Sequence, residues 1–104
     1  MRVEWDMKAV EGRDRIADYI KESFGYKRKD IFLQEVRQTT RMLKKYPNMG
    51  FIDPLFVEYQ HTYRSIVIGG LSKMVYFVEN DSIYIAAFWD CRQEPETQTS
   101  EMEK

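Results

Sequence analysis

The sequence predicts one two-layer α+β domain, with elements in the order β-α-α-β-β-β and a helical hairpin packed on an antiparallel sheet. Apolar residues recur at helical spacing in the first half of the chain, whereas residues 63–89 are rich in Val, Ile, Tyr and Phe and contain two turn-forming dipeptides. A length of 104 residues fits a single compact domain, which we expect to span residues 1–95.

Residues 3–5 are predicted to form a short first strand, and Asp6 is a suitable N-cap for the helix that follows. Apolar side chains then recur at helical spacing, at Ala9, Ile16, Ile20 and Phe24. Gly25 stands where a C-cap glycine is common. We therefore expect a helix over residues 7–24, in which Gly12 is a mild weak point.

A second helix is predicted to start after Asp30, which can act as its N-cap. Its apolar stripe consists of Phe32, Val36, either Thr39 or Thr40, and Leu43. Pro47 limits its extension. The two helices would then be joined by about five residues, which favours an antiparallel hairpin.

Residues 46–61 have no clear period and are interpreted as a loop with apolar anchors. Three strands are then predicted, at 63–68, 73–78 and 82–89. Gly69-Gly70 and Asn80-Asp81 separate them, and both pairs suit tight turns that need positive φ. Because the last strand is apolar on both faces, we expect it to be central or covered twice.

Charge is distributed unevenly although the net charge is only −1. Residues 27–45 contain seven cations and two acids, a net charge of +5, and residues 79–104 contain two cations and seven acids, a net charge of −5. One interpretation is a solvated basic helix and a disordered acidic tail at 96–104. The alternative is a basic face that meets an anionic partner, although the overall charge does not indicate strong nonspecific nucleic-acid binding.

No membrane segment, cofactor or metal site is expected. The longest apolar run, 83–89, is far shorter than the roughly 20 residues of a membrane span, and a cytoplasmic location is predicted. The single cysteine, Cys91, cannot form an internal disulfide and, with one histidine, cannot build a zinc site. We expect Cys91 to be a buried, inert thiol.

Three cations are expected to share one region of the sheet. With a turn at 69–70, Lys73 should pair near residue 66 or 67, while Arg64 lies further along the ladder and Arg92 follows the last strand. Such a cluster would suit phosphate or carboxylate binding. The alternative is three surface cations with local ion pairs.

No standard catalytic motif is present. His61, Asp90 and Glu94 are weak candidates for acid–base roles. A structural or solvent-facing histidine and surface carboxylates beside Arg92 are the simpler interpretation.

The ordered set of motifs resembles the RelE/ParE superfamily of toxins from bacterial type II toxin–antitoxin modules, a group that includes plasmid stabilisation proteins. The motifs are V-E-W, R-D-x-I-A-D-Y-I, F-x-x-E-V, Y-P-N-M-G, Y-R-S-I-V-I-G, K-M-V-Y-F-V and I-Y-I-A-A-F-W-D-C-R-Q-E-P. They run from about residue 3 to residue 95 and are strongest over 63–95.

This resemblance implies a toxin that a cognate antitoxin neutralises in a hetero-oligomeric complex. RelE-like members cleave messenger RNA in the ribosome, whereas ParE-like members bind DNA gyrase and are not nucleases. Matched residue by residue, the family pattern selects Arg64, Lys73 and Arg92 as the residues that bind the target or RNA.

The departures from the pattern favour a ParE-like toxin that binds gyrase. RNA-cleaving members have a histidine or tyrosine after the last strand, where this chain has Gln93 and Glu94. Asp90 stands where many relatives have histidine, and the chain lacks the strong basic charge of ribosome-directed members. A ribosome-dependent mRNA endoribonuclease and a non-toxic intracellular interaction domain remain the alternatives.

Overall fold

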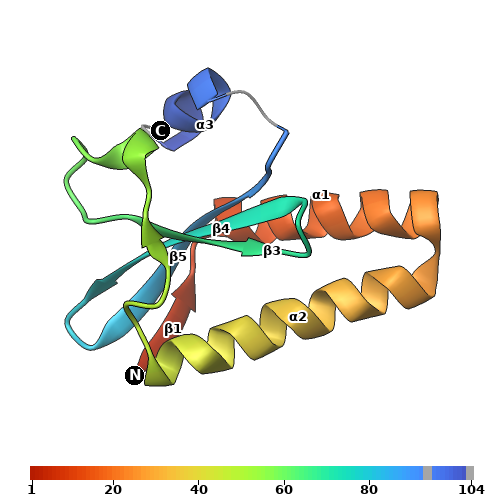
Figure 1. The fold of residues 1–104 in the computed structure, drawn as a ribbon, viewed down its shortest axis with the longest axis horizontal. Coiled ribbons are helices and arrows are strands. Elements are labelled where there is room, and N and C mark those ends of the chain that lie inside the picture. Colours follow the sequence, from red (N-terminus) through yellow and green to blue (C-terminus); the bar gives the residue numbers. More distant parts are fainter. Residues whose placement is uncertain (93–94, 103–104) are drawn as a thin grey trace.

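A computed structural model describes residues 1–92 and 95–102 (Figure 1). The elements are β1 (Arg2–Trp5), α1 (Met7–Phe24), α2 (Tyr26–Lys45), β2 (Phe51–Ile52), a 3-10 turn η1 (Pro54–Phe56), β3 (Arg64–Ile68), β4 (Ser72–Glu79), β5 (Ser82–Asp90) and α3 (Pro95–Met102). The predicted α+β class and the helical hairpin are confirmed. In the part of the chain that is described, no helix is both long and apolar enough to cross a membrane.

The sheet has five strands in the order β1-β5-β4-β3-β2. The predicted meander of β3, β4 and β5 is confirmed, and both turns have the expected positive φ, 65° and 74° at Gly69 and Gly70 and 52° and 62° at Asn80 and Asp81. The sheet is mixed rather than wholly antiparallel, because β1 pairs parallel to β5. The edge strand β2 was not predicted, since two residues carry no measurable period.

Asp6 caps α1 as predicted, because its Oδ1 accepts a hydrogen bond of 2.8 Å from the Lys8 amide. At the other end of α1, a single residue, Gly25, joins it to α2. The prediction that the second helix starts after Asp30 was wrong, since α2 begins at Tyr26. Gly25 alone forms the turn between the helices, with a φ of 94° that favours glycine. Its carbonyl accepts the first hydrogen bond of α2, from the Lys29 amide.

At Gly12 the backbone of α1 lies directly against β5 of the sheet. A Cβ at this position would lie 2.1 Å from the carbonyl oxygen of Phe88 on β5. Only a residue without a side chain allows the helix backbone to approach the strand this closely. The sequence shows the glycine but not the strand it faces.

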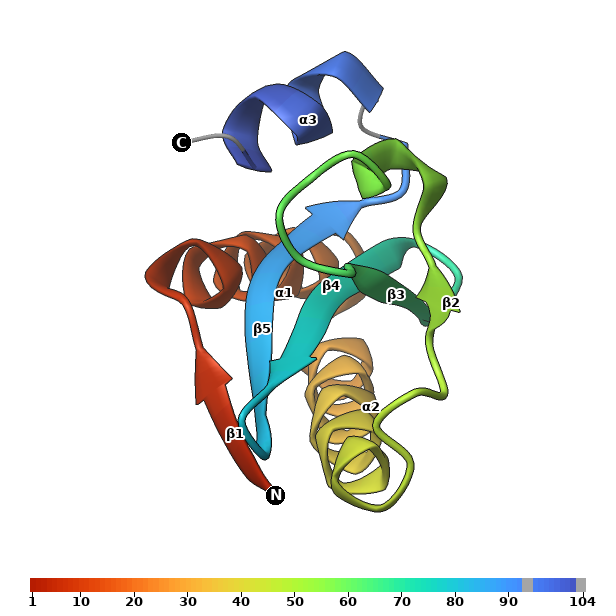
Figure 2. The same ribbon diagram turned by 90° about the vertical axis from the view of Figure 1, so that its left-hand side faces the viewer.

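Both faces of the sheet carry a core, as predicted from the apolar sequence of β5. The α1–α2 hairpin covers one face, and its core includes Ala9, Phe32, Leu43, Met74, Tyr76 and Phe88. The second core lies on the other face, which Figure 2 shows, and consists of Phe56, Val75, Ala87, Trp89 and Met102. Residues 53–63 and α3 supply its cover.

The predicted disordered tail is instead a helix over most of its length. In α3, Met102 is buried, and the Thr99 carbonyl accepts a hydrogen bond of 3.1 Å from the Tyr59 hydroxyl. The indole of Trp89 donates a hydrogen bond of 2.6 Å to Glu101 Oε2. An acidic, polar composition does not reveal that one methionine anchors the segment to the second core. The last two residues of the predicted tail, 103–104, lie outside the described part.

Replacing Gly12 with alanine is expected to lower the free energy of unfolding by about 3 kcal/mol, because the new methyl group would overlap the Phe88 carbonyl. Chemical denaturation measures the change. Ser23→Ala, at an exposed position of the same helix, is the matched control and should change the stability by less than about 0.5 kcal/mol. Equal stability of the two variants would contradict the close approach.

Candidate functional site

The structure does not bring the three predicted cations together. Lys73 pairs with Val67 in the sheet, as expected, but its side chain lies on the face of the second core, 5.5 Å from the ring centroid of Phe56. Arg64 pairs with Tyr76, which belongs to the core beneath the helices. The two cations therefore point to opposite faces of the sheet, and the predicted cluster is not formed.

Arg64 holds the chain that follows α2 against β3. Its Nη1 donates hydrogen bonds of 2.8 Å to the Gly50 carbonyl and 3.2 Å to the Asn48 carbonyl. Nearby, the Tyr76 hydroxyl donates to the Pro47 carbonyl at 2.7 Å and accepts from the Gly50 amide at 3.0 Å. These contacts give Arg64 a structural role.

Lys73 forms a buried ion pair that the sequence did not reveal. Its Nζ lies 2.8 Å from Asp53 Oδ2, and the two residues are only 9% and 2% exposed. The Asp53 carboxylate also accepts hydrogen bonds of 2.7 Å from the Ser65 hydroxyl and 3.0 Å from the Leu55 amide. Burial by itself would raise the pKa of Asp53, but the bonds from Lys73, Ser65 and the Leu55 amide lower its pKa overall.

Arg92 pairs with the carboxylate beside it. It donates hydrogen bonds of 3.0 and 2.6 Å to the two oxygens of Asp90, and these bonds are the main reason that the pKa of Asp90 is lowered. The guanidinium also lies 5.4 Å from the ring centroid of Tyr19 on α1. With 59% of its side chain exposed, Arg92 is the most accessible of the three predicted cations.

Cys91 is exposed, so the expectation of a buried thiol was wrong. The residue follows the end of β5, where its amide donates a hydrogen bond of 2.7 Å to the Leu71 carbonyl and the alternation of the strand no longer applies. Desolvation raises the pKa of the thiol.

The catalytic candidates do not form one site. The His61 ring stacks on Phe77 with 3.8 Å between centroids, and its Nδ1 lies 3.3 Å from Glu79 Oε2 at the C-terminal end of β4. Asp90 pairs with Ser72 at the opposite end of β4. The length of this strand places the two roughly 23 Å apart. Glu94 lies outside the described residues.

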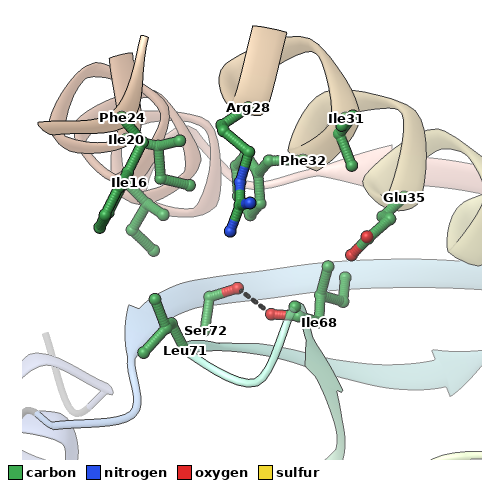
Figure 3. Close-up of a pocket in the computed structure, with 11 residues that line it drawn as sticks. Ile16, Ile20, Phe24, Arg28, Ile31, Phe32, Glu35, Ile68, Leu71 and Ser72 are labelled. Carbon is green, nitrogen blue, oxygen red and sulfur yellow. Dashed lines mark hydrogen bonds between the residues drawn. The ribbon is translucent and has the colours of Figure 1, made fainter. Parts of the chain in front are cut away.

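A cleft lies between the helical hairpin and the β3–β4 turn, with a volume of about 310 Å³ (Figure 3). The hairpin cleft, as we name it, is lined mainly by apolar side chains from both helices and the turn: Ile16, Ile20, Phe24, Ile31, Phe32, Ile68 and Leu71. Several of them remain accessible, and Phe24 is 56% exposed. Such a surface on a small protein indicates a binding site for an apolar partner.

Two charged side chains enter the hairpin cleft from α2. Arg28 reaches toward the sheet in Figure 3, and its guanidinium lies 5.8 Å from the ring centroid of Phe24. Glu35 faces the β3–β4 turn. Among the described residues neither forms a salt bridge. The cleft therefore offers one cation and one anion for orienting a bound segment.

Within residues 1–92 and 95–102, no cluster of His, Cys, Asp or Glu could hold a metal ion.

Comparison with known proteins identifies the family. A model of the family described as the ParE toxin of the type II toxin–antitoxin system, parDE, matches residues 3–95. The chain belongs to the ParE toxin family. No curated protein sequence matches it. The fold is similar to that of a chain in the chromosomal ParDE TA system from P. aeruginosa, with a TM-score of 0.69 and 20% identity, covering 86% of this chain and 95% of that chain.

Membership of the ParE toxin family confirms the resemblance drawn from the motifs. The three cations that were expected to bind the target are not gathered into one cluster, and their roles remain a prediction. Four of the cleft residues, Ile16, Ile20, Phe24 and Phe32, were assigned to the apolar stripes of the two helices from their spacing. The sequence could not show that they also line a cleft. Asp53 had a local signal, since an aspartate before proline often caps a short helical turn. No local sequence pattern predicted that Asp53 would pair with Lys73.

Removing either charge of the buried Asp53–Lys73 ion pair should lower the free energy of unfolding by about 3 kcal/mol, because the remaining charge is left buried without its partner. Asp53→Asn and Lys73→Met test this by chemical denaturation. The double variant should lose clearly less than the sum of the single losses. Additive losses would show that the two charges do not stabilise each other.

The same pair should make stability fall in acid. Because the pKa of Asp53 is lower in the folded protein than its usual value of about 3.9, its contribution is complete above that pH and is lost as the pH falls through the folded pKa. Denaturation midpoints should therefore decrease more steeply below about pH 4 in the native chain than in Asp53→Asn/Lys73→Met. The Asp90–Arg92 pair is retained in both proteins and its effect cancels.

Proposed function

We propose that this chain is a toxin that a cognate antitoxin neutralises, and that it acts in the cytoplasm by binding a macromolecular target, namely DNA gyrase. Its membership of the ParE toxin family supports the toxin role. The observation that carries the binding mechanism is the hairpin cleft, an open apolar surface of a kind that suits a protein segment. In this proposal, a segment of the antitoxin occupies the cleft and gives a toxin–antitoxin hetero-oligomer.

A binding mechanism fits the described residues better than RNA cleavage does. Cleavage through the 2′-hydroxyl would need a base and an acid within hydrogen-bond reach of the same nucleotide. His61 and Asp90 lie at opposite ends of β4, and the Asp90 carboxylate is held by Arg92. Lys73, which the family pattern assigns to the target or RNA, is buried against Asp53 and is not accessible to either. Arg92 is the predicted cation best placed to contact a partner.

Controlled expression of the toxin should cause filamentation and a DNA damage response without cleavage of transcripts. The purified chain should also inhibit supercoiling by gyrase. Translation arrest with cleaved transcripts would instead support the endoribonuclease alternative. Normal growth with undiminished gyrase activity would support the third alternative, a non-toxic interaction domain.

Charge placed in the hairpin cleft should weaken antitoxin binding. Ile31 and Leu71 are each 42% exposed, so Ile31→Glu and Leu71→Glu should fold while burying a carboxylate against the bound segment. We expect each variant to bind at least about tenfold more weakly, measured by calorimetry with the antitoxin encoded beside the toxin gene.

Val57→Glu is the matched control, because Val57 is 66% exposed and lies outside the cleft. It should bind as the native chain does. If all three variants bind the antitoxin equally well, the cleft is not the antitoxin site.

A further inference from the structure

The C-terminal half of α2 carries a row of cations that the fold does not use. Arg37, Arg41, Lys44 and Lys45 are all exposed and lie within about 100° of the helix circumference. Among the described residues none of the four forms a salt bridge. No acid lies between residues 36 and 45. The helix dipole favours Lys44 and Lys45 in the last turn, but it does not account for Arg37 and Arg41.

A shallow groove of about 820 Å³ runs beside three of these cations, Arg41, Lys44 and Lys45, whereas Arg37 lies on the side of α2 that faces Asp14 and Asp18 of α1. Its apolar lining comes from Met42 on α2 and Met49 in the following loop, which are 47% and 41% exposed. Arg41, Lys44 and Lys45 form its basic side. The groove therefore combines flexible, polarisable side chains with positive charge. We name it the basic groove.

We infer that the basic groove binds an acidic, apolar segment of a protein partner. The methionines offer an adaptable surface for aliphatic side chains, and the unpaired cations offer partners for carboxylates on the same segment. A nucleic acid would use the cations but has no aliphatic side chains for the methionines. The net charge of −1 also gives the molecule no general attraction for a phosphate backbone.

The basic groove is separate from the hairpin cleft. Arg28 marks the cleft near the start of α2 and Arg41 marks the groove near its end, which places them roughly 20 Å apart along the helix. A second segment, or a distant part of the same partner, can bind there while the cleft is occupied. The inference goes beyond the proposed function, since it requires neither the antitoxin nor gyrase.

Methyl NMR of the intact chain tests this directly. A synthetic amphipathic peptide of Glu and Leu residues, added to millimolar concentration, should shift the methyl signals of Met42 and Met49. Met74, which is fully buried in the core, serves as an internal control and should not move. Arg41→Gln/Lys45→Gln should weaken binding of the peptide roughly tenfold, because two ion pairs are lost.

Lys8→Gln/Lys27→Gln is the matched control, since it removes the same charge from exposed positions outside the groove. It should bind the peptide within about twofold of the native chain. No shift at Met42 and Met49, or equal binding by the two double variants, would overturn the inference. So would a duplex DNA oligonucleotide that binds this groove more tightly than the peptide does.

Discussion

The side of the sheet that faces away from the helical hairpin depends on the buried ion pair between Asp53 and Lys73. Asp53 lies just after the edge strand β2, and Lys73 lies on the central strand β4. Their contact fixes the start of η1, which places Phe56 over Trp89 in the second core. α3 then docks on that core through Met102. The ion pair thus positions the short turn on which an irregular stretch and the C-terminal helix pack.

How much the sequence predicted depends on how local each determinant is. The bounds of α1, the cap at Asp6 and the two β-turns were predicted, because each depends on residues a few positions apart. The close approach at Gly12 involves residues far apart in the chain, and no local pattern reports it. For the site, Lys73 was placed correctly in the register, but the predicted cluster ignored that Arg64 points to the other face and that Asp53 neutralises Lys73.

The helix α2 connects the hairpin cleft and the basic groove. Its buried stripe, Phe32, Val36 and Leu43, holds it on the sheet, so its two ends keep a fixed separation. One end contributes Arg28 to an apolar cleft, and the other contributes Arg41 to a basic groove. A partner that contacts both must match the length of the helix. This requirement adds selectivity without additional contacts, because a segment of the wrong length reaches only one surface.

The parallel pairing of β1 with β5 also constrains the order of events during synthesis. Arg2–Trp5 are made before the helices and the meander, but their partners, Ser82–Ile85, lie on the last strand of the sheet to be translated. Until then the first strand has no neighbour in the sheet, although both helices and the rest of the meander have been made. The complete sheet therefore forms only after β5 has been translated, and a product truncated before Ser82 lacks the strand that pairs with β1.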